Sequence, residues 1–270
     1  LFRHRIRNFR KTYLPLTRTY LDLEELRRSP PQADCIIVGS DQVWNISSPI
    51  RGFDPTFFLE FLGSGGPRRV SYAASVGNGT ELGEYRKQIS DLLSRFDHIS
   101  VRDVTSQKLV QLLVERRVEH VLDPSFLIDY DAITPPPIVK PPYILAYCFR
   151  RNELSSLALR SLRERLGLPV VSINLEFDQA RRVDPGPLQW LSLMKYASFI
   201  CTDSFHGTCF SLINKTQFVT LEFKGGMTRL EDLLQTSTIP ERLVSNRSQL
   251  EYALSAPIDF HTVSSAIAKA

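Results

Sequence analysis

The residues with the clearest potential for chemistry lie in one short segment, Thr202-Asp203-Ser204-Phe205-His206-Gly207-Thr208. The segment stands where an apolar run gives way to a predicted helix, and the titratable ring of His206 is at its centre. A histidine gains or loses a proton near neutral pH, so it can act as a general acid or base. Asp203 and Ser204 could orient that ring, and Gly207 would give a ligand room to approach. The alternative is a core histidine that donates to a carbonyl, which is the usual state of a lone histidine.

Spacing argues against two other uses of this ring. The remaining histidines show no metal-ligand pattern with His206, and we expect no metal site. They are His4, His98, His120 and His261. No Gly-x-Ser-x-Gly elbow occurs, so a Ser-His-Asp hydrolase is not predicted either.

A second candidate turn follows the predicted strand at residues 35–38. Gly39 allows a tight bend, and the three residues after it offer hydrogen bonds to a ligand at a helix start. These are Ser40, Asp41 and Gln42. The turn equally fits a helix cap in which Trp44 packs as core.

Two further strand ends carry polar groups. Residues 71–79 include Ser75 and run into a glycine-containing loop that could cradle an anion with its amides, or be a plain turn. They match neither a P-loop nor a dinucleotide fingerprint. Arg102 ends another predicted strand, where its guanidinium could hold a carboxylate or phosphate. Its alternative is a salt bridge at the sheet rim, to Asp103 or Asp123.

The composition is that of an ordinary soluble globular protein, with 43% hydrophobic and 23% charged residues in 270. No apolar stretch approaches the roughly 20 residues of a membrane span, and no secretory signal is present, so we expect a cytoplasmic protein without an integral membrane segment. The cysteines lie in apolar runs without a CxxC pair, which favours buried free thiols. They are Cys35, Cys148, Cys201 and Cys209.

Residues 1–20 carry six basic side chains and no acidic one. Such a segment could be a nucleic-acid arm, a transit peptide or a solvated helix face. The helical spacing of Phe2, Ile6, Phe9 and Tyr13 favours the helix, so no nucleic-acid partner is predicted.

Strands and helices are predicted to alternate along both halves of the chain, which implies parallel sheets covered on both faces. Predicted strands are residues 35–38, 69–73, 99–102, 118–122, 143–149, 170–173, 197–201 and 218–221. Predicted helices are residues 81–96, 105–115, 153–166, 187–196 and 206–213. A proline-rich connector at residues 135–142 is expected to separate a domain of residues 1–134 from one of residues 143–270.

Five ordered blocks of this sequence resemble those of the polysaccharide pyruvyl transferase family. The blocks are residues 39–45, 71–75, 99–103, 122–125 and 202–208, and the resemblance extends from residue 34 to residue 242. It implies an α/β fold of two Rossmann-like domains facing across a cleft, similar to the glycosyltransferase B architecture. It also implies transfer of the pyruvyl group of phosphoenolpyruvate to a sugar hydroxyl of a cell-surface glycan, giving a pyruvate ketal and phosphate.

The resemblance assigns roles to particular residues. His206 matches the proton donor to the methylene carbon, Arg102 matches an arginine that grips the anionic substrate, and Asp41 matches an acid that could orient groups or accept a proton. The further positions expected to contact substrate are Ser40, Gln42, Ser75, Ser204, Gly207 and Thr208. The implied partners are phosphoenolpyruvate and a glycan, with no metal or organic cofactor. The acceptor sugar, its hydroxyl and the oligomeric state are not predicted.

The chain departs from the family pattern in two places. Ser204-Phe205 stands where some members have Arg-Leu, so another cation must serve there. Arg102, Lys224 and Arg229 are the candidates. The chain also begins at Leu1 without the family's opening βα unit, which suggests a fragment with an unpaired sheet edge and puts its activity in question.

Two other functions stay open on the sequence alone. One is a nucleotide-sugar-dependent glycosyltransferase of the same architecture, in which Glu222 and Lys224 would hold the nucleotide. The other is a glycan-binding remnant without catalytic activity.

Overall fold

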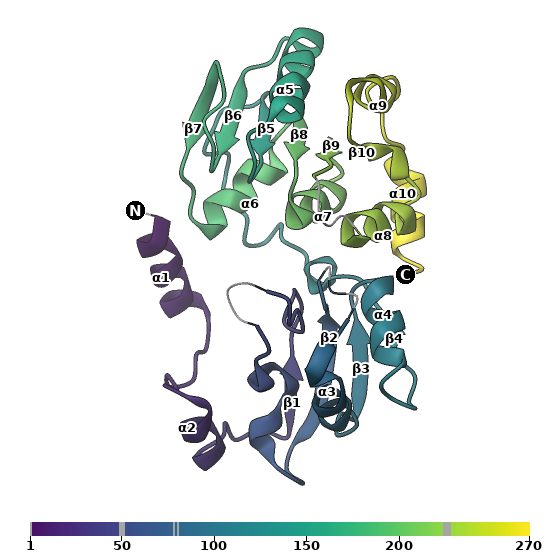
Figure 1. Ribbon diagram of the computed structural model, residues 1–270. Helices are drawn as coiled ribbons and strands as arrows, with labels where there is room; N and C mark the ends of the chain where they lie inside the picture. Colours follow the sequence, from purple (N-terminus) through teal and green to yellow (C-terminus); the bar gives the residue numbers. More distant parts are fainter. Residues whose placement is uncertain (1, 49–51, 78, 80, 224–227) are drawn as a thin grey trace. The chain divides into compact units, whose positions relative to one another are not determined.

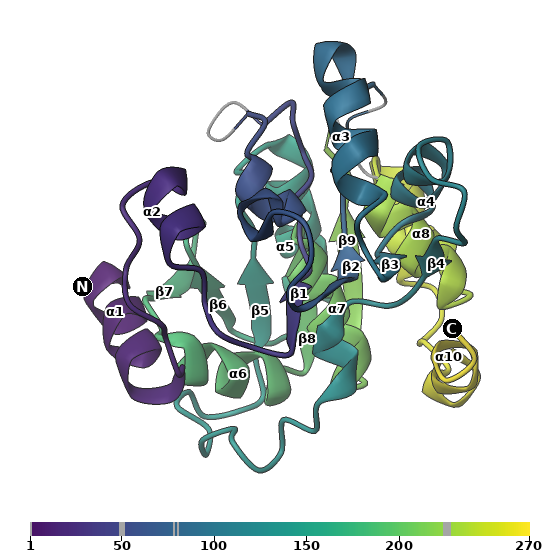
Figure 2. The same ribbon diagram turned by 90° about the horizontal axis from the view of Figure 1, so that it is seen from below.

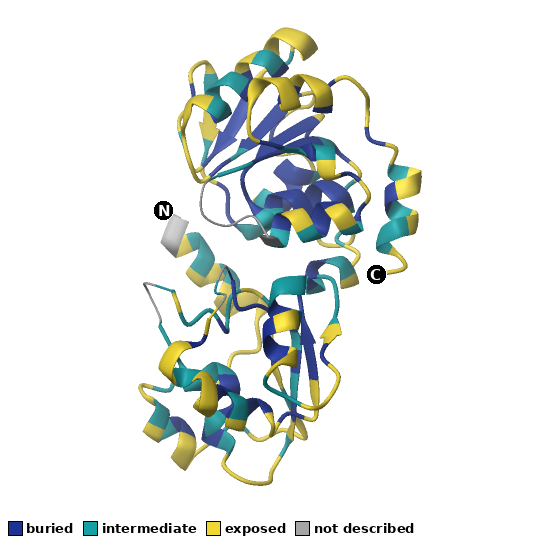
Figure 3. Cartoon of the chain, turned by 45° about the vertical axis from the view of Figure 1, so that its right-hand side comes forward, coloured by how far each residue is buried: buried dark blue, intermediate teal, exposed yellow. Residues whose placement is uncertain are grey.

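The computed structural model describes residues 2–48, 52–77, 79, 81–223 and 228–270 (Figure 1). The chain divides into two compact units. The first unit is Thr17–Pro124, and the second unit combines Leu1–Leu16 with Ser125–Ala270. Each unit has its own parallel sheet, whose central strands are mostly buried while helices and loops are more exposed (Figure 3).

The first unit contains a sheet of four parallel strands in the order β1-β2-β3-β4. The strands are β1 (Cys35–Val38), β2 (Arg68–Ala74), β3 (His98–Val101) and β4 (Glu119–His120). The helices are α2 (Leu23–Arg28), α3 (Arg86–Leu93) and α4 (Val104–Gln111). Trp44 and Phe96 are fully buried and pack edge to face in the core of this unit. The turn at residues 39–45 thus supplies core as well as polar groups, as its structural alternative anticipated.

The second unit contains a sheet of six parallel strands in the order β10-β9-β8-β5-β6-β7. The strands are β5 (Ile144–Tyr147), β6 (Val170–Ile173), β7 (Ala180–Val183), β8 (Phe199–Thr202), β9 (Gln217–Leu221) and β10 (Leu243–Val244). Read from β7, this is the 3-2-1-4-5-6 order of a Rossmann fold, in which the order of strand addition reverses between β5 and β8. That reversal is the place where such sheets bind ligands.

Helices cover both faces of the second sheet (Figure 2). The helices of this unit are α1 (Phe2–Tyr13), which packs on α6, and α5 (Glu153–Leu166), α6 (Pro187–Lys195), α7 (Phe205–Ile213), α8 (Thr228–Thr236), α9 (Arg247–Ala253) and α10 (Phe260–Ile267). Ala158 and Leu162 of α5 pack with Ile144 of β5 in one core cluster. On the opposite face the buried Tyr143 hydroxyl donates to the Leu193 carbonyl of α6 at 2.9 Å. Both faces are therefore covered, as a parallel sheet requires.

The predicted alternation of strands and helices is confirmed, and so is the fold class of two Rossmann-like α/β units. Helix α5 and the strands β1 and β6 begin and end where the sequence predicted. The helix predicted over residues 81–96 is shorter, because residues 83–85 form a 3-10 turn before α3. Edge strand β7 and the three helices after residue 227 were not predicted.

The structure tests two further predictions, on the basic segment at residues 1–20 and on the burial of the four cysteines. The basic segment is the helix α1, as predicted, and Arg5 anchors it by donating hydrogen bonds to the Asp184 carbonyl and the Gln189 side chain. The prediction of four buried thiols is wrong for Cys35, which lies with the 60% exposed Ile37 on the uncovered face of β1. The other cysteines are buried and free.

The compact units differ from the domain boundary drawn from sequence. Residues 1–16 and 125–134 belong to the second unit, with the proline-rich residues 135–142. The Ser192 hydroxyl on α6 donates to the Pro136 carbonyl at 2.9 Å and accepts from the Ile138 amide at 3.3 Å. These bonds fasten the proline-rich segment to α6. No helix in the described ranges combines the length and apolar character needed to cross a membrane.

Candidate functional site

In the second unit, the turn from β8 into α7 is fixed by tight local packing. The Ser204 hydroxyl caps α7 by accepting from the Gly207 amide at 3.2 Å. A Cβ at Gly207 would lie 2.2 Å from the Thr202 Oγ1 and 3.0 Å from its Cβ. The glycine is therefore needed where the helix meets the strand, and the room predicted for a ligand at Gly207 is occupied by Thr202.

Asp203 ties the ends of β8 and β5 together at the point where the strand order of the sheet reverses. Its carboxylate accepts the amides of Phe149 and Arg150 at 2.7 and 2.9 Å. Burial raises the pKa of Asp203, while these two hydrogen bonds and the Arg150 charge act in the opposite direction. Asp203 thus fixes the backbone where the strand order reverses. Its role is structural, and it does not contact His206 directly.

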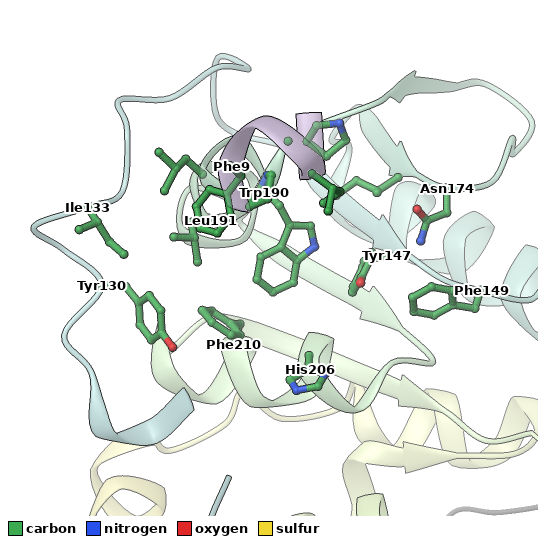
Figure 4. A pocket seen from close by; sticks show the side chains of 16 residues that line it. Phe9, Tyr130, Ile133, Tyr147, Phe149, Asn174, Trp190, Leu191, His206 and Phe210 are labelled. Carbon is green, nitrogen blue, oxygen red and sulfur yellow. The ribbon is translucent and has the colours of Figure 1, made fainter. Parts of the chain in front are cut away.

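His206, in the first turn of α7, lies at the margin of a cavity of about 490 Å³ and is one of its lining residues (Figure 4). Aromatic rings form much of the wall: Trp190 packs edge to face on Tyr147 and Phe210, with ring centroids 5.4 and 4.7 Å apart. Asn174 and His206 are the polar side chains that Figure 4 shows beside them. No lysine, arginine, aspartate or glutamate lines this cavity. It suits an uncharged ligand with an apolar face.

In the first unit, the polar residues at three strand ends meet around Arg102. Its guanidinium donates to Asp123 at 2.7 Å, to Asp41 at 3.0 Å and to the Ser40 hydroxyl at 3.3 Å. The Ser40 hydroxyl in turn donates to Asp123 at 2.7 Å. The Arg102 and Asp123 side chains are 1% and 3% exposed, whereas that of Asp41 is 59% exposed. One cation faces two carboxylates, so the cluster is negative overall and its accessible charge is Asp41.

Asp41 itself has a left-handed backbone with φ 74°. Its carbonyl accepts the Ser75 amide at 3.0 Å, which pairs the turn after β1 with the end of β2. Gly39, the residue predicted to allow the bend, has no positive φ. A left-handed non-glycine residue is sparsely populated and needs such support from its neighbours.

Other predicted contact residues use their polar groups inside the protein. The Ser75 hydroxyl donates to Asp103 at 2.6 Å and accepts the Gly77 amide at 3.0 Å. Asp103 also caps α4. The Thr208 hydroxyl is fully buried and shares a hydrogen bond of 2.8 Å with Thr220.

Gln42 also bonds within its own turn. Its side-chain oxygen accepts a hydrogen bond from the Asn45 side-chain Nδ2 at 2.7 Å. The pair closes the turn that follows Asp41.

The structure therefore gathers the predicted residues into two groups. Ser40, Asp41 and Arg102 lie together in the first unit, and Ser204 and His206 lie together in the second. Their predicted meeting across a cleft stays a prediction. Sequence reasoning missed the aromatic wall, because single aromatic residues on different elements give no local pattern. Lys224, one of the cations considered, lies outside the described residues.

No group of three or more histidine, cysteine, aspartate or glutamate side chains in the described ranges is arranged to hold a metal ion. Strand ends carrying polar side chains, together with the strand order of the second sheet, define an α/β protein built from two Rossmann-like units. The chain belongs to the polysaccharide pyruvyl transferase family, whose model matches residues 2–224. Membership of this family implies a transferase that acts on a glycan acceptor.

The first of two similar solved structures supports the fold alone. A Listeria monocytogenes protein assigned as a UDP-N-acetylglucosamine 2-epimerase is similar with a TM-score of 0.55 and 12% identity, over 92% of this chain and 70% of that one. The UDP-GlcNAc 2-epimerase of Methanocaldococcus jannaschii, in complex with UDP-GlcNAc and UDP, gives a TM-score of 0.48 and 14% identity, over 86% of this chain and 70% of that one. No curated protein matches the chain.

Proposed function

We propose that this protein transfers the pyruvyl group of phosphoenolpyruvate to a glycan, forming a pyruvate ketal and releasing inorganic phosphate. The observation that carries the proposal is His206. It stands in the first turn of α7 and lines an aromatic cavity at the carboxyl edge of a Rossmann-type sheet, within the segment matched by the family. Two of the groups that the chemistry needs, an imidazole and an uncharged binding surface, are thus together in one unit.

His206 is the proton donor in the proposed reaction. A protonated imidazole gives its proton to the methylene carbon of phosphoenolpyruvate, and the carbon–carbon double bond supplies the electrons for the new C–H bond. The adjacent carbon becomes oxocarbenium-like, and a sugar hydroxyl adds to it. A second hydroxyl of the same sugar then displaces phosphate to close the ketal, and the two hydroxyl protons pass to bases or solvent.

Asp41 is the proposed acceptor of a hydroxyl proton. Its side chain is 59% exposed, and Arg102 fixes the orientation of its carboxylate through a hydrogen bond of 3.0 Å. The aromatic wall formed by Tyr147, Trp190 and Phe210 is the proposed surface for the sugar, because the C–H face of a pyranose packs against aromatic rings. We expect no cofactor to take part.

The test is a His206→Gln variant assayed with radiolabelled phosphoenolpyruvate and a panel of glycans. We expect label transfer and phosphate release from the unaltered protein, and a loss of about 10²- to 10⁴-fold in the variant, the usual contribution of general acid catalysis. His261→Gln, an exposed histidine in helix α10, is the matched control and should retain full activity. Equal turnover by His206→Gln would remove His206 as the acid. Thermal stabilisation by UDP, GDP or CMP but not by phosphoenolpyruvate would instead indicate a nucleotide-sugar transferase.

A further inference from the structure

We propose that Arg150 forms an oxyanion-binding site at the switch point of the second sheet and holds the carboxylate or phosphate of the donor there. This inference rests on the proposed function for the identity of the donor. It answers a chemical requirement of the reaction, since phosphoenolpyruvate carries charge on both of these groups and needs cations to hold them.

The backbone of Arg150 is locked in place. The residue lies three positions after the end of β5, and its backbone amide donates to Asp203 at 2.9 Å. Asp203 stands three residues before His206, after the neighbouring strand β8. Phe149, the residue before it, lines the same cavity as His206. The Arg150 side chain therefore starts from a fixed point beside the proposed acid.

The Arg150 guanidinium is positioned by stacking on an aromatic ring and not by hydrogen bonds. Its carbon lies 3.6 Å from the ring centroid of Phe223, and the side chain is 51% exposed. Asp203 approaches it only to 4.0 Å, which is beyond hydrogen-bond distance, and both Asp203 oxygens already accept backbone amides. Within the described residues, the guanidinium donates no hydrogen bond. A flat guanidinium on an aromatic face keeps its edge of N–H donors for a bidentate oxyanion.

The charges around the other candidate sites also favour Arg150 as the cation that binds the donor. Arg102, the cation expected from sequence, already faces the carboxylates of Asp41 and Asp123, so its cluster would repel a second anion. The aromatic cavity has no lysine, arginine, aspartate or glutamate in its lining. The Arg229 guanidinium carbon lies 5.7 Å from the ring centroid of Phe205, in the first turn of α7.

The neighbouring arginine provides a matched control. Arg151 is 49% exposed, almost the same as Arg150, but its guanidinium is engaged by Asp178 at 2.9 Å and by the Glu176 carbonyl at 3.1 Å. Arg150→Gln and Arg151→Gln remove the same charge from adjacent positions. Only the first removes the proposed oxyanion contact.

The experiment measures binding of phosphoenolpyruvate, inorganic phosphate and pyruvate to the full chain by titration calorimetry, with KM and kcat for phosphoenolpyruvate wherever turnover is detected. We expect Arg150→Gln to weaken phosphoenolpyruvate binding about 10- to 100-fold and to raise KM more than it lowers kcat, as loss of a charge-assisted pair does. Arg151→Gln should stay within about 2-fold of the unaltered protein, and both variants should keep its urea midpoint.

The separate ligands identify the contact and separate the two proposals. Loss of phosphate affinity alone would assign Arg150 to the phosphate, and loss of pyruvate affinity alone would assign it to the carboxylate. If Arg150→Gln binds all three ligands like the unaltered protein, the inference is overturned while the proposed function stands. If the unaltered protein binds phosphate through Arg150 but not phosphoenolpyruvate, the oxyanion site stands and the proposed function fails.

Discussion

Gly207→Ala offers a direct test of how the start of α7, and with it His206, is held. The added Cβ would lie 2.2 Å from the Thr202 Oγ1, 3.0 Å from its Cβ and 3.1 Å from its Cγ2. All three atoms belong to a β-branched side chain whose hydroxyl donates to the Tyr147 carbonyl at 2.6 Å and accepts the Ser204 amide at 3.1 Å. The side chain cannot turn away without breaking both bonds. The clash must therefore be relieved by movement of the helix itself.

The size of the effect follows from these contacts. Overpacking a filled site costs about 1–3 kcal/mol, and the better helix propensity of alanine returns up to about 1 kcal/mol. We expect a net loss of about 1–2 kcal/mol in the free energy of unfolding of the second unit. Thr202→Ala alone should lower the free energy of unfolding by about 1–2 kcal/mol as well, because its hydroxyl hydrogen bonds are lost. The double variant removes the two atoms at 2.2 and 3.1 Å, so its loss should be about 1–2 kcal/mol smaller than the sum of the single losses.

Urea denaturation of the four proteins, followed by circular dichroism and tryptophan fluorescence with one transition fitted per unit, gives this double-mutant cycle. Gly39→Ala is the control, because a Cβ at Gly39 meets nothing within 4 Å and its φ is not positive. It should change stability by less than about 0.5 kcal/mol. Additivity of Gly207→Ala and Thr202→Ala to within about 0.5 kcal/mol would show that the two side chains do not collide. The packing account of Gly207 would then be wrong.

Three other outcomes follow from buried or exposed groups. Arg102→Gln should destabilise the first unit by about 3–5 kcal/mol, because it leaves the buried Asp123 without its ion pair; a loss below about 1 kcal/mol in urea denaturation would contradict this. Burial raises the pKa of Asp203, so its stabilising contribution is present at low pH and declines as pH rises through the folded-state pKa. The stability penalty of Asp203→Asn should therefore be larger at pH 4 than at pH 7, and the reverse order would show that its hydrogen bonds outweigh burial. A thiol reagent should label Cys35 quickly in the native protein and the other three cysteines only after unfolding, because Cys35 alone of the four is exposed.

Elements with strong local patterns were predictable from the sequence. Helix α5 has an Asn152 cap, an amphipathic run and a left-handed Gly167 at its end, and its predicted limits are those observed. Strand β6 is a short apolar run buried along its whole length. Edge strand β7 has two exposed arginines in the middle, Arg181 and Arg182, so it lacks the apolar pattern that marks a strand.

For the candidate site, the sequence revealed which residue types stand at strand ends but not which neighbours they meet. Arg102 was open to a ligand or a rim salt bridge, and its two carboxylate partners come from strand ends 61 and 21 positions away along the chain. Arg150 carried no signal at all, since an arginine after an apolar strand is common. Its close stacking on Phe223, a residue far along the chain, and the hydrogen bonds that Arg151 donates to Asp178 and Glu176 distinguish the two arginines only in the folded structure.

In each unit, one aspartate that follows a strand holds neighbouring backbone in place by hydrogen bonds. These structural aspartates can therefore be told apart from the accessible groups in the same motifs. Asp103 caps α4 and binds Ser75, and Asp203 ties β5 to β8. Each is buried, with both of its oxygens accepting hydrogen bonds, so neither is placed to exchange a proton with a substrate. The groups that stay accessible at the same strand ends are Asp41 in the first unit and Arg150 in the second, and His206 lines the aromatic cavity. Because framework carboxylates fix the backbone around each of these groups, substitutions there should alter stability first and activity second, whereas substitutions of the accessible groups should do the opposite.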